Sequence, residues 1–180
     1  MSTTFADLRS TPIATAAVIV AAGGAATILG AYFFQYVIGL KPCPLCLEQR
    51  FAYYFAIPLA LMALLGTSFG ASRKVLIAAL VVIAAMMLWN AGLGAYHAGV
   101  EWKWWEGPRD CTGDIGSFGN AGDLLRQIQT TSLVRCDEIP WSFLGLSLAG
   151  YNALISLALA IVAGWGALTA YKHPGAAEGA

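Results

Sequence analysis

Charged residues are scarce in this chain. Asp, Glu, Lys and Arg make up only 11% of its 180 residues, whereas an ordinary soluble domain contains about 25%. Ten basic and ten acidic residues cancel to a formal net charge of zero, so no excess of positive charge is present to attract nucleic acid. With 58% hydrophobic residues, the composition excludes a typical soluble domain and indicates a membrane protein.

Four long stretches contain no Asp, Glu, Lys or Arg. They are residues 10–40, 51–72, 75–100 and 139–171. Since a spanning helix needs about 20 largely apolar residues, the sequence predicts an all-α membrane protein in which residues 1–180 form a single four-transmembrane-helix bundle. The first stretch is much longer than the apolar core of a cleaved signal peptide, so we expect it to remain as a span. The predicted spans are approximately 13–38, 47–67, 74–97 and 142–171.

An even number of spans places both termini on one side of the membrane. The loops after the first and third spans then share the other side, and together they hold all four cysteines. The basic residues favour neither orientation when simply counted, but the short turn containing Arg73 and Lys74 favours the cytoplasm. Paired cysteines persist in oxidising compartments. The sequence therefore predicts cytoplasmic termini and cysteines that face the opposite, periplasm-like side.

The long loop at about 98–141 contains features of a membrane surface. Trp102, Trp104 and Trp105 follow the third span, and tryptophan favours the interface between lipid and water. Asp123 can cap a short amphipathic helix whose apolar face carries Leu124, Leu125 and Ile128. This helix is predicted either to lie on the membrane surface or to be an ordinary loop helix.

The stretch Lys41-Pro-Cys-Pro-Leu-Cys-Leu-Glu-Gln-Arg50 contains the only C-x-x-C pair. Pro44 suits a first helical position, so Cys43 and Cys46 are predicted at the beginning of the second span. A helix N-terminus stabilises a thiolate, which favours a pair that cycles between dithiol and disulfide. A structural disulfide and a metal site remain alternatives, although His97 is the only histidine near the cysteines.

Arg50 follows Cys46 by one helical turn and is predicted to share its face of the helix. A permanent cation at this place can stabilise a thiolate or the anion of a reduced quinone. The alternative is an interfacial arginine whose charged group reaches water. Beside a C-x-x-C pair, the redox role is the favoured interpretation.

These motifs resemble those of the DsbB family of disulfide bond formation proteins. The resemblance covers nearly the whole chain, and its last motif is Cys136-Asp-Glu-Ile-Pro-Trp-Ser-Phe-Leu-Gly-Leu146. It implies an inner-membrane protein dithiol:quinone oxidoreductase that reoxidises a DsbA-like periplasmic carrier and passes the electrons to a membrane quinone, ubiquinone or menaquinone. Gln49 departs from the pattern, because some relatives carry an acid at this position.

The resemblance also implies residue roles. Cys111 and Cys136 would oxidise the carrier, and Cys43 and Cys46 would be reoxidised by quinone. Cys46 would contact the quinone, Arg50 would belong to the quinone site, and His97 would lie near it. We expect resting disulfides Cys43–Cys46 and Cys111–Cys136, with a transient Cys43–Cys136 link during turnover.

Two other functions are compatible with parts of this pattern. An enzyme similar to vitamin K epoxide reductase would also place a C-x-x-C pair beside a quinone in a four-helix bundle, but there the pair comes late in the chain. A non-catalytic metal-binding or transport protein is the second alternative. Transport usually requires ionisable groups within the spans, and the four charge-free stretches lack Asp, Glu, Lys and Arg.

Overall fold

The computed structural model describes residues 12–108 and 135–173, and four long helices dominate this part of the chain. They are α2 (Pro12–Tyr32), α3 (Pro44–Ser68), α4 (Arg73–Glu101) and α7 (Leu148–Lys172). The π-helix η1 (Phe33–Val37) continues α2. All four are long and apolar enough to cross a membrane. The chain is therefore a multi-pass membrane protein with the predicted helical-bundle fold.

The fourth span begins at Leu148, six residues after its predicted start at Ser142. Residues Ser142–Phe143 (β1) and Leu146–Ser147 (β2) instead form a small antiparallel hairpin. Leu144 and Gly145 both have positive φ angles, of 49° and 79°, as expected of the tight turns that suit two-residue hairpin loops. The apolar character of this segment concealed the turn, because leucine rarely adopts a positive φ.

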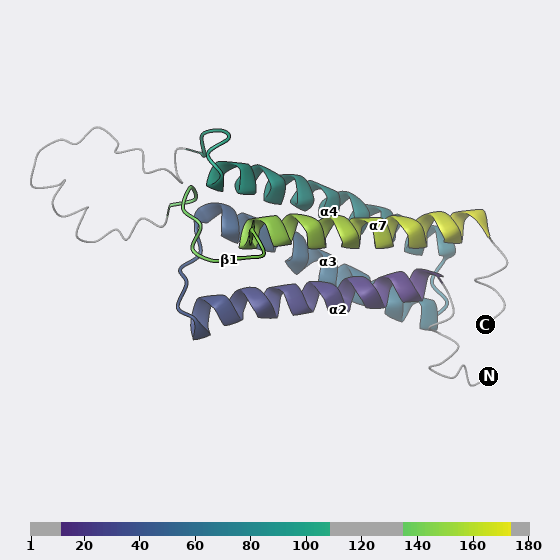
Figure 1. Ribbon diagram of the computed structural model, residues 1–180. Helices are drawn as coiled ribbons and strands as arrows, with labels where there is room; N and C mark the ends of the chain where they lie inside the picture. Colours follow the sequence, from purple (N-terminus) through teal and green to yellow (C-terminus); the bar gives the residue numbers. More distant parts are fainter. Residues whose placement is uncertain (1–11, 109–134, 174–180) are drawn as a thin grey trace, which may run out of the picture.

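The four helices lie alongside one another and alternate in direction along the chain (Figure 1). Each packs against its neighbours in sequence, and α7 also packs against α2, which closes the bundle. One end holds the turn between α3 and α4, with the start of α2 and the end of α7; we call it the turn end. The other, the cysteine end, holds the start of α3, the end of α4 and the hairpin (Figure 1).

Small residues allow the helices to approach closely. A Cβ atom added to Gly94 of α4 would lie 2.9 Å from the backbone nitrogen of Ala153 in α7. At the turn end, a Cβ atom on Gly166 would lie 2.5 Å from the Cβ of Ala16 in α2. Close backbone contacts of this kind drive helix association in lipid, where the hydrophobic effect between helices is absent. The interior is accordingly rich in buried alanine, including Ala17, Ala56, Ala60, Ala63, Ala163 and Ala167.

Two predictions concern residues outside the described ranges. The amphipathic helix was predicted from residues 123–128, and Cys111 belongs to the same segment; both lie between 108 and 135. The outer face of the described helices is apolar, as a lipid environment requires. It exposes large side chains that include Leu29, Phe55, Met62, Leu88, Trp89, Ile161 and Leu168.

Candidate functional site

Cys43 and Cys46 form the beginning of α3, as the proline spacing predicts. Cys43 is the N-cap residue, and Pro44 occupies the first turn. The backbone N–H of Cys46 donates to the Cys43 sulfur at 3.2 Å, so the cysteine takes the capping role that Ser or Asp usually fills. This geometry directs both side chains toward the same side of the helix, where their sulfurs lie 2.6 Å apart.

The two cysteines are free thiols in this structure, so the disulfide expected between them at rest is not formed in it. Cys43 is 3% exposed. Its contact with Cys46, followed by burial, raises the pKa of the Cys43 thiol well above its usual range. Cys46 is only half-buried, whereas a free N–H of the first turn donates to the Cys43 sulfur. The two sulfurs therefore have different environments at the start of α3.

Cys136 lies against this pair, although it is 90 residues from Cys46. It is buried in a small cluster with Cys43, Leu45 and Val100. The sulfurs of Cys43 and Cys136 and a ring nitrogen of His97 all lie within 4.8 Å of one another. Cys136 is itself in a disulfide, and the described residues do not include its partner. The predicted pairing with Cys111 thus falls outside the described ranges.

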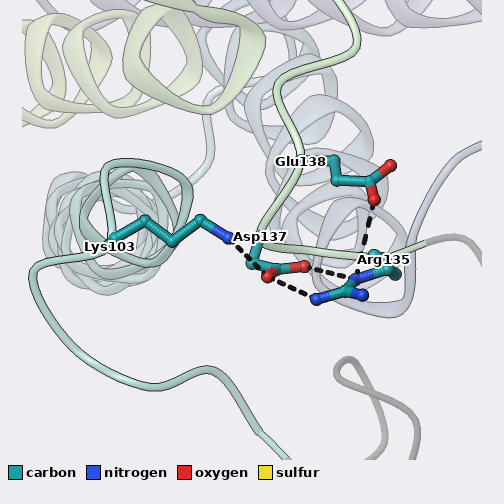
Figure 2. Close-up of polar contacts among 4 residues, drawn as sticks. All are labelled: Lys103, Arg135, Asp137 and Glu138. Atoms are coloured by element: carbon teal, nitrogen blue, oxygen red, sulfur yellow. Dashed lines mark hydrogen bonds and ion pairs between the residues drawn. The ribbon is translucent and has the colours of Figure 1, made fainter.

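An ion-pair cluster holds the segment that carries Cys136 against the end of α4 (Figure 2). The Asp137 carboxylate accepts from Lys103 at 2.7 Å and from Arg135 at 2.8 Å, and Arg135 also lies 3.6 Å from Glu138. The hydrogen bonds from Arg135 and then from Lys103 lower the pKa of Asp137 well below its usual range. Because Asp137 is next to Cys136 in the chain, this cluster connects the segment that carries that cysteine to Lys103, just past the end of α4.

Arg50 is 9% exposed, although it lies in a transmembrane helix. Its guanidinium donates to the Gln35 side-chain oxygen at 2.6 Å and lies 5.4 Å from the centre of the Tyr32 ring. None of the ion pairs found within residues 12–108 and 135–173 involves Arg50. A neutral amide and an aromatic ring thus solvate a buried cation, which leaves its positive charge available to an anion.

A cavity of about 1100 Å³ opens beside these residues. Side chains of α2, α3, α7 and the segment before the hairpin line most of it, and apolar residues predominate. Cys46, Arg50 and His97 are among the residues that line it. The size and apolar lining suit a drug-sized apolar ligand that carries a few polar atoms. The predicted residues Cys43, Cys46, Arg50, His97 and Cys136 are therefore gathered at one site.

The DsbB family profile, described as disulfide bond formation protein DsbB, matches residues 14–166. The chain belongs to the DsbB family. Relatives named disulfide bond formation protein B include a Polaromonas sp. protein, 31% identical over 72% of this chain and 76% of the relative. The protein from Albidiferax ferrireducens is 34% identical over 71% of this chain and 75% of its own. No solved structure matches the chain.

Membership of the DsbB family supports an oxidoreductase role in disulfide bond formation. A further relative with this name, from Xanthomonas campestris, is 30% identical over 81% of this chain and 83% of its own. The vitamin K epoxide reductase-like alternative has no support among these relatives. The cluster of Cys43, His97 and Cys136 has metal-ligand spacing, but a cysteine in a disulfide offers no thiolate to a metal ion.

Several polar residues of this DsbB-family site were not predicted. Gln35 contacts Arg50, Asn152 contacts Gln49, and Glu101 accepts a hydrogen bond from Ser147, the N-cap of α7. Each belongs to or borders a long apolar run, and this is the signal that could have identified them. Polar groups at membrane depth are costly, so they mark functional or packing contacts.

Proposed function

We propose that the protein is a thiol oxidase of the bacterial inner membrane that takes electrons from a DsbA-like dithiol carrier and transfers them to a membrane quinone. The observation that carries the proposal is the distance of at most 4.8 Å between the sulfurs of Cys43 and Cys136. These cysteines belong to different segments, and their proximity permits direct thiol–disulfide exchange between the two cysteine pairs.

The proposed exchange proceeds through three successive attacks on disulfides. The carrier thiolate attacks Cys111, which forms a carrier–Cys111 disulfide and leaves the electron pair on Cys136. The Cys136 thiolate attacks Cys43 of the Cys43–Cys46 disulfide, so that a Cys43–Cys136 bond forms and Cys46 leaves as a thiolate. The second carrier thiolate then releases Cys111 and forms the carrier disulfide. Two electrons have then passed from the carrier to the protein, which is left with a Cys43–Cys136 bond and with thiolates at Cys46 and Cys111.

The residues around the cavity fit a quinone head group. A bound quinone supplies a two-electron acceptor. Cys46 lines the cavity and would reduce the quinone, and Arg50 adds a buried positive charge to the lining. In a poorly hydrated site this charge stabilises a developing anion more strongly than it would in water. Ubiquinone and menaquinone both have a head group and an apolar tail that suit such a site.

The central experiment is a quinone-reduction assay with a reduced DsbA-like carrier and the purified protein. We expect carrier oxidation that depends on quinone, and its absence would overturn the proposal. A Cys136→Ala variant should trap a covalent carrier adduct through Cys111. Survival of that adduct after Cys111→Ser in the same background would refute the assignment of Cys111. Measurement of bound metal and bound quinone distinguishes this function from the metal-binding alternative.

The proposed orientation places both termini in the cytoplasm and the cysteine end at the periplasmic side. The four described spans support two ends on opposite sides, because consecutive helices alternate in direction. Reporter fusions at Ser68 and Asn120 should therefore report opposite sides, with Ser68 in the cytoplasm. Equal reports from both fusions would contradict the topology.

A further inference from the structure

A chain of hydrogen-bonded side chains leads from the bundle interior to Cys43. It links residues of α4, α7 and α3, all within membrane-spanning helices. The chain begins at Asn90, which donates to Ser156 at 2.9 Å, and Ser156 lies 2.8 Å from the Tyr53 hydroxyl. Tyr53 donates to Asn152 at 2.7 Å, and Asn152 donates to Gln49 at 2.6 Å. The chain ends where Gln49 lies 2.8 Å from His97. The redox steps proposed above use Cys43, toward which this chain leads, and none of the six polar residues themselves.

The hydrogen bonds of this chain all point in one direction. The Tyr53 hydroxyl has one hydrogen, which it donates to the Asn152 carbonyl oxygen. The amide nitrogen of Asn152 is therefore turned toward Gln49 and donates to the Gln49 carbonyl oxygen. The amide nitrogen of Gln49 in turn faces Nδ1 of His97. An amide nitrogen only donates, so Nδ1 must accept.

This direction determines where the histidine carries its hydrogen. A neutral imidazole has one donor and one acceptor nitrogen. Since Nδ1 accepts from Gln49, the hydrogen of a neutral His97 is on Nε2. That nitrogen lies 3.6 Å from the Cys43 sulfur. The donor nitrogen of the ring therefore faces Cys43.

We propose that Gln49, Asn152 and Tyr53 are positioning residues that hold neutral His97 with its hydrogen on Nε2, as a hydrogen-bond donor to the Cys43 sulfur. The inference deepens the proposed function and rests on it. A buried polar network that merely joins the helices would need a hydrogen-bond partner for each polar group. It would not need every residue to donate toward the same end of the network. Here the direction ends at the sulfur that connects the two cysteine pairs.

The donor acts when the Cys43–Cys136 link is resolved. The Cys111 thiolate attacks Cys136, which re-forms the Cys111–Cys136 disulfide, breaks the Cys43–Cys136 bond and leaves the electron pair on Cys43. A hydrogen bond from His97 Nε2 stabilises the negative charge that develops on this leaving sulfur. If the hydrogen were on Nδ1 instead, the lone pair of Nε2 would face the Cys43 sulfur and would disfavour its departure as a thiolate.

The tautomer can be measured directly by nitrogen NMR of the full-length protein labelled at histidine. The chain has two histidines, and a His173→Gln variant assigns the spectrum. We expect His97 in the unmodified protein to give a single neutral form protonated on Nε2. A ring protonated on Nδ1, or on both nitrogens, at neutral pH would overturn the proposal. This measurement requires neither carrier nor quinone.

Three variants test whether the chain of donors selects this form. Gln49→Leu removes the donor to Nδ1, so we expect a mixture of tautomers and a changed Nδ1 signal. Tyr53→Phe acts from two residues further along the chain, because it frees Asn152 to reverse its amide, and should also give a mixture. Ser156→Ala is the matched control: it loses buried hydrogen bonds but leaves the Tyr53 donor, so the single tautomer should persist. Unchanged His97 signals in both Gln49→Leu and Tyr53→Phe would refute the positioning role.

The kinetic consequence is tested with the purified protein in a single turnover. A Cys43–Cys136 link formed in Gln49→Leu should be resolved about tenfold or more slowly than in the unmodified protein, which corresponds to loss of a hydrogen bond to a charged group. An unchanged rate with a mixed tautomer would refute the effect on the leaving sulfur. If His97 shows the expected single form protonated on Nε2 but the protein does not oxidise the carrier, only the proposed function is contradicted.

Discussion

The turn end and the cysteine end of the bundle are built differently. At the turn end, small residues bring the helices into close contact, and Arg73 donates to the carbonyl oxygens of Ala170 and Tyr171 at the end of α7. At the cysteine end, α2 and α7 border a cavity of about 1100 Å³ with buried polar side chains. The comparison indicates that helix contacts and hydrogen bonds to backbone close one end, whereas reactive side chains surround a cavity at the other.

The largest expected effect is at the first turn of α3. Replacement of Cys46 by serine removes the sulfur that lines the cavity, and quinone-dependent turnover should fall below detection. One round of exchange between the carrier and Cys111–Cys136 should continue, since it does not use Cys46. Quinone absorbance and carrier thiol content, measured in parallel, separate the two steps. Substantial steady-state turnover in Cys46→Ser would contradict the role of the cysteine end.

The next largest effect is expected for Arg50. Arg50→Met removes the buried charge and should slow quinone reduction about tenfold to a hundredfold, the cost of losing a hydrogen bond to a charged group. Arg50→Lys is the control; it keeps the charge but not the planar group that reaches Gln35, so a partial loss is expected. Steady-state quinone kinetics measure both variants. Equal activity of Arg50→Met and the unmodified protein would reduce this residue to a membrane anchor.

A smaller effect is expected for the ion-pair cluster beside Cys136. Asp137→Asn removes the acceptor shared by Lys103 and Arg135, and should lower the yield of the Cys43–Cys136 cross-link severalfold. The lowered pKa of Asp137 means that its contribution is fully present above the ordinary value of about 4 and is lost as pH falls below it.

The pH dependence of cross-link yield measures this contribution. The cross-link yield of the unmodified protein should decline in acid. In Asp137→Asn, the part of this decline that is caused by protonation of Asp137 should be absent. Glu138→Gln is the matched control, because Glu138 is exposed and lies 3.6 Å from Arg135. An effect of Glu138→Gln as large as that of Asp137→Asn would indicate general surface charge and not this cluster.

The smallest effect on turnover is expected at the turn end. Gly166→Val introduces atoms where Ala16 already lies 2.5 Å from an added Cβ, and should lower the free energy of unfolding by about 1–3 kcal/mol. Turnover per folded molecule should be unchanged. Gly164→Val is the control, because an added Cβ at Gly164 meets nothing within 4 Å. The measurements are thermal unfolding in detergent and quinone turnover per folded molecule. If Gly166→Val loses turnover while its stability is unchanged, the contrast between the turn end and the cysteine end is contradicted.

Much of this organisation could be predicted from the sequence. The charge-free runs predicted four spans because uncompensated charge is costly in lipid, and Pro44 predicted where α3 begins. The spacing from Cys46 to Arg50 predicted a shared helix face, and the two line the same cavity. These features are local, so the residues that specify them are near one another in the chain.

Contacts between distant segments could not be predicted in the same way. No pattern in the sequence shows that Lys103 meets Asp137 or that Asn152 meets Gln49, because these pairs depend on how α4 and α7 are placed against α3. The hairpin at Ser142–Ser147 was hidden for another reason. Its turn uses Leu144 at a positive φ, and the surrounding apolar residues are equally typical of a helix.

The π-helix at Phe33–Val37 has a consequence for insertions and deletions. A π-turn holds one more residue than an α-turn and is equivalent to a single inserted residue within a helix. Gln35, the partner of Arg50, lies within this turn. Deleting one residue there would restore regular α-helical winding without rotating the preceding face of α2, because the widened turn already accommodates the extra residue. The π-turn therefore takes up one residue at the end of the first span while the Gln35 amide stays beside Arg50.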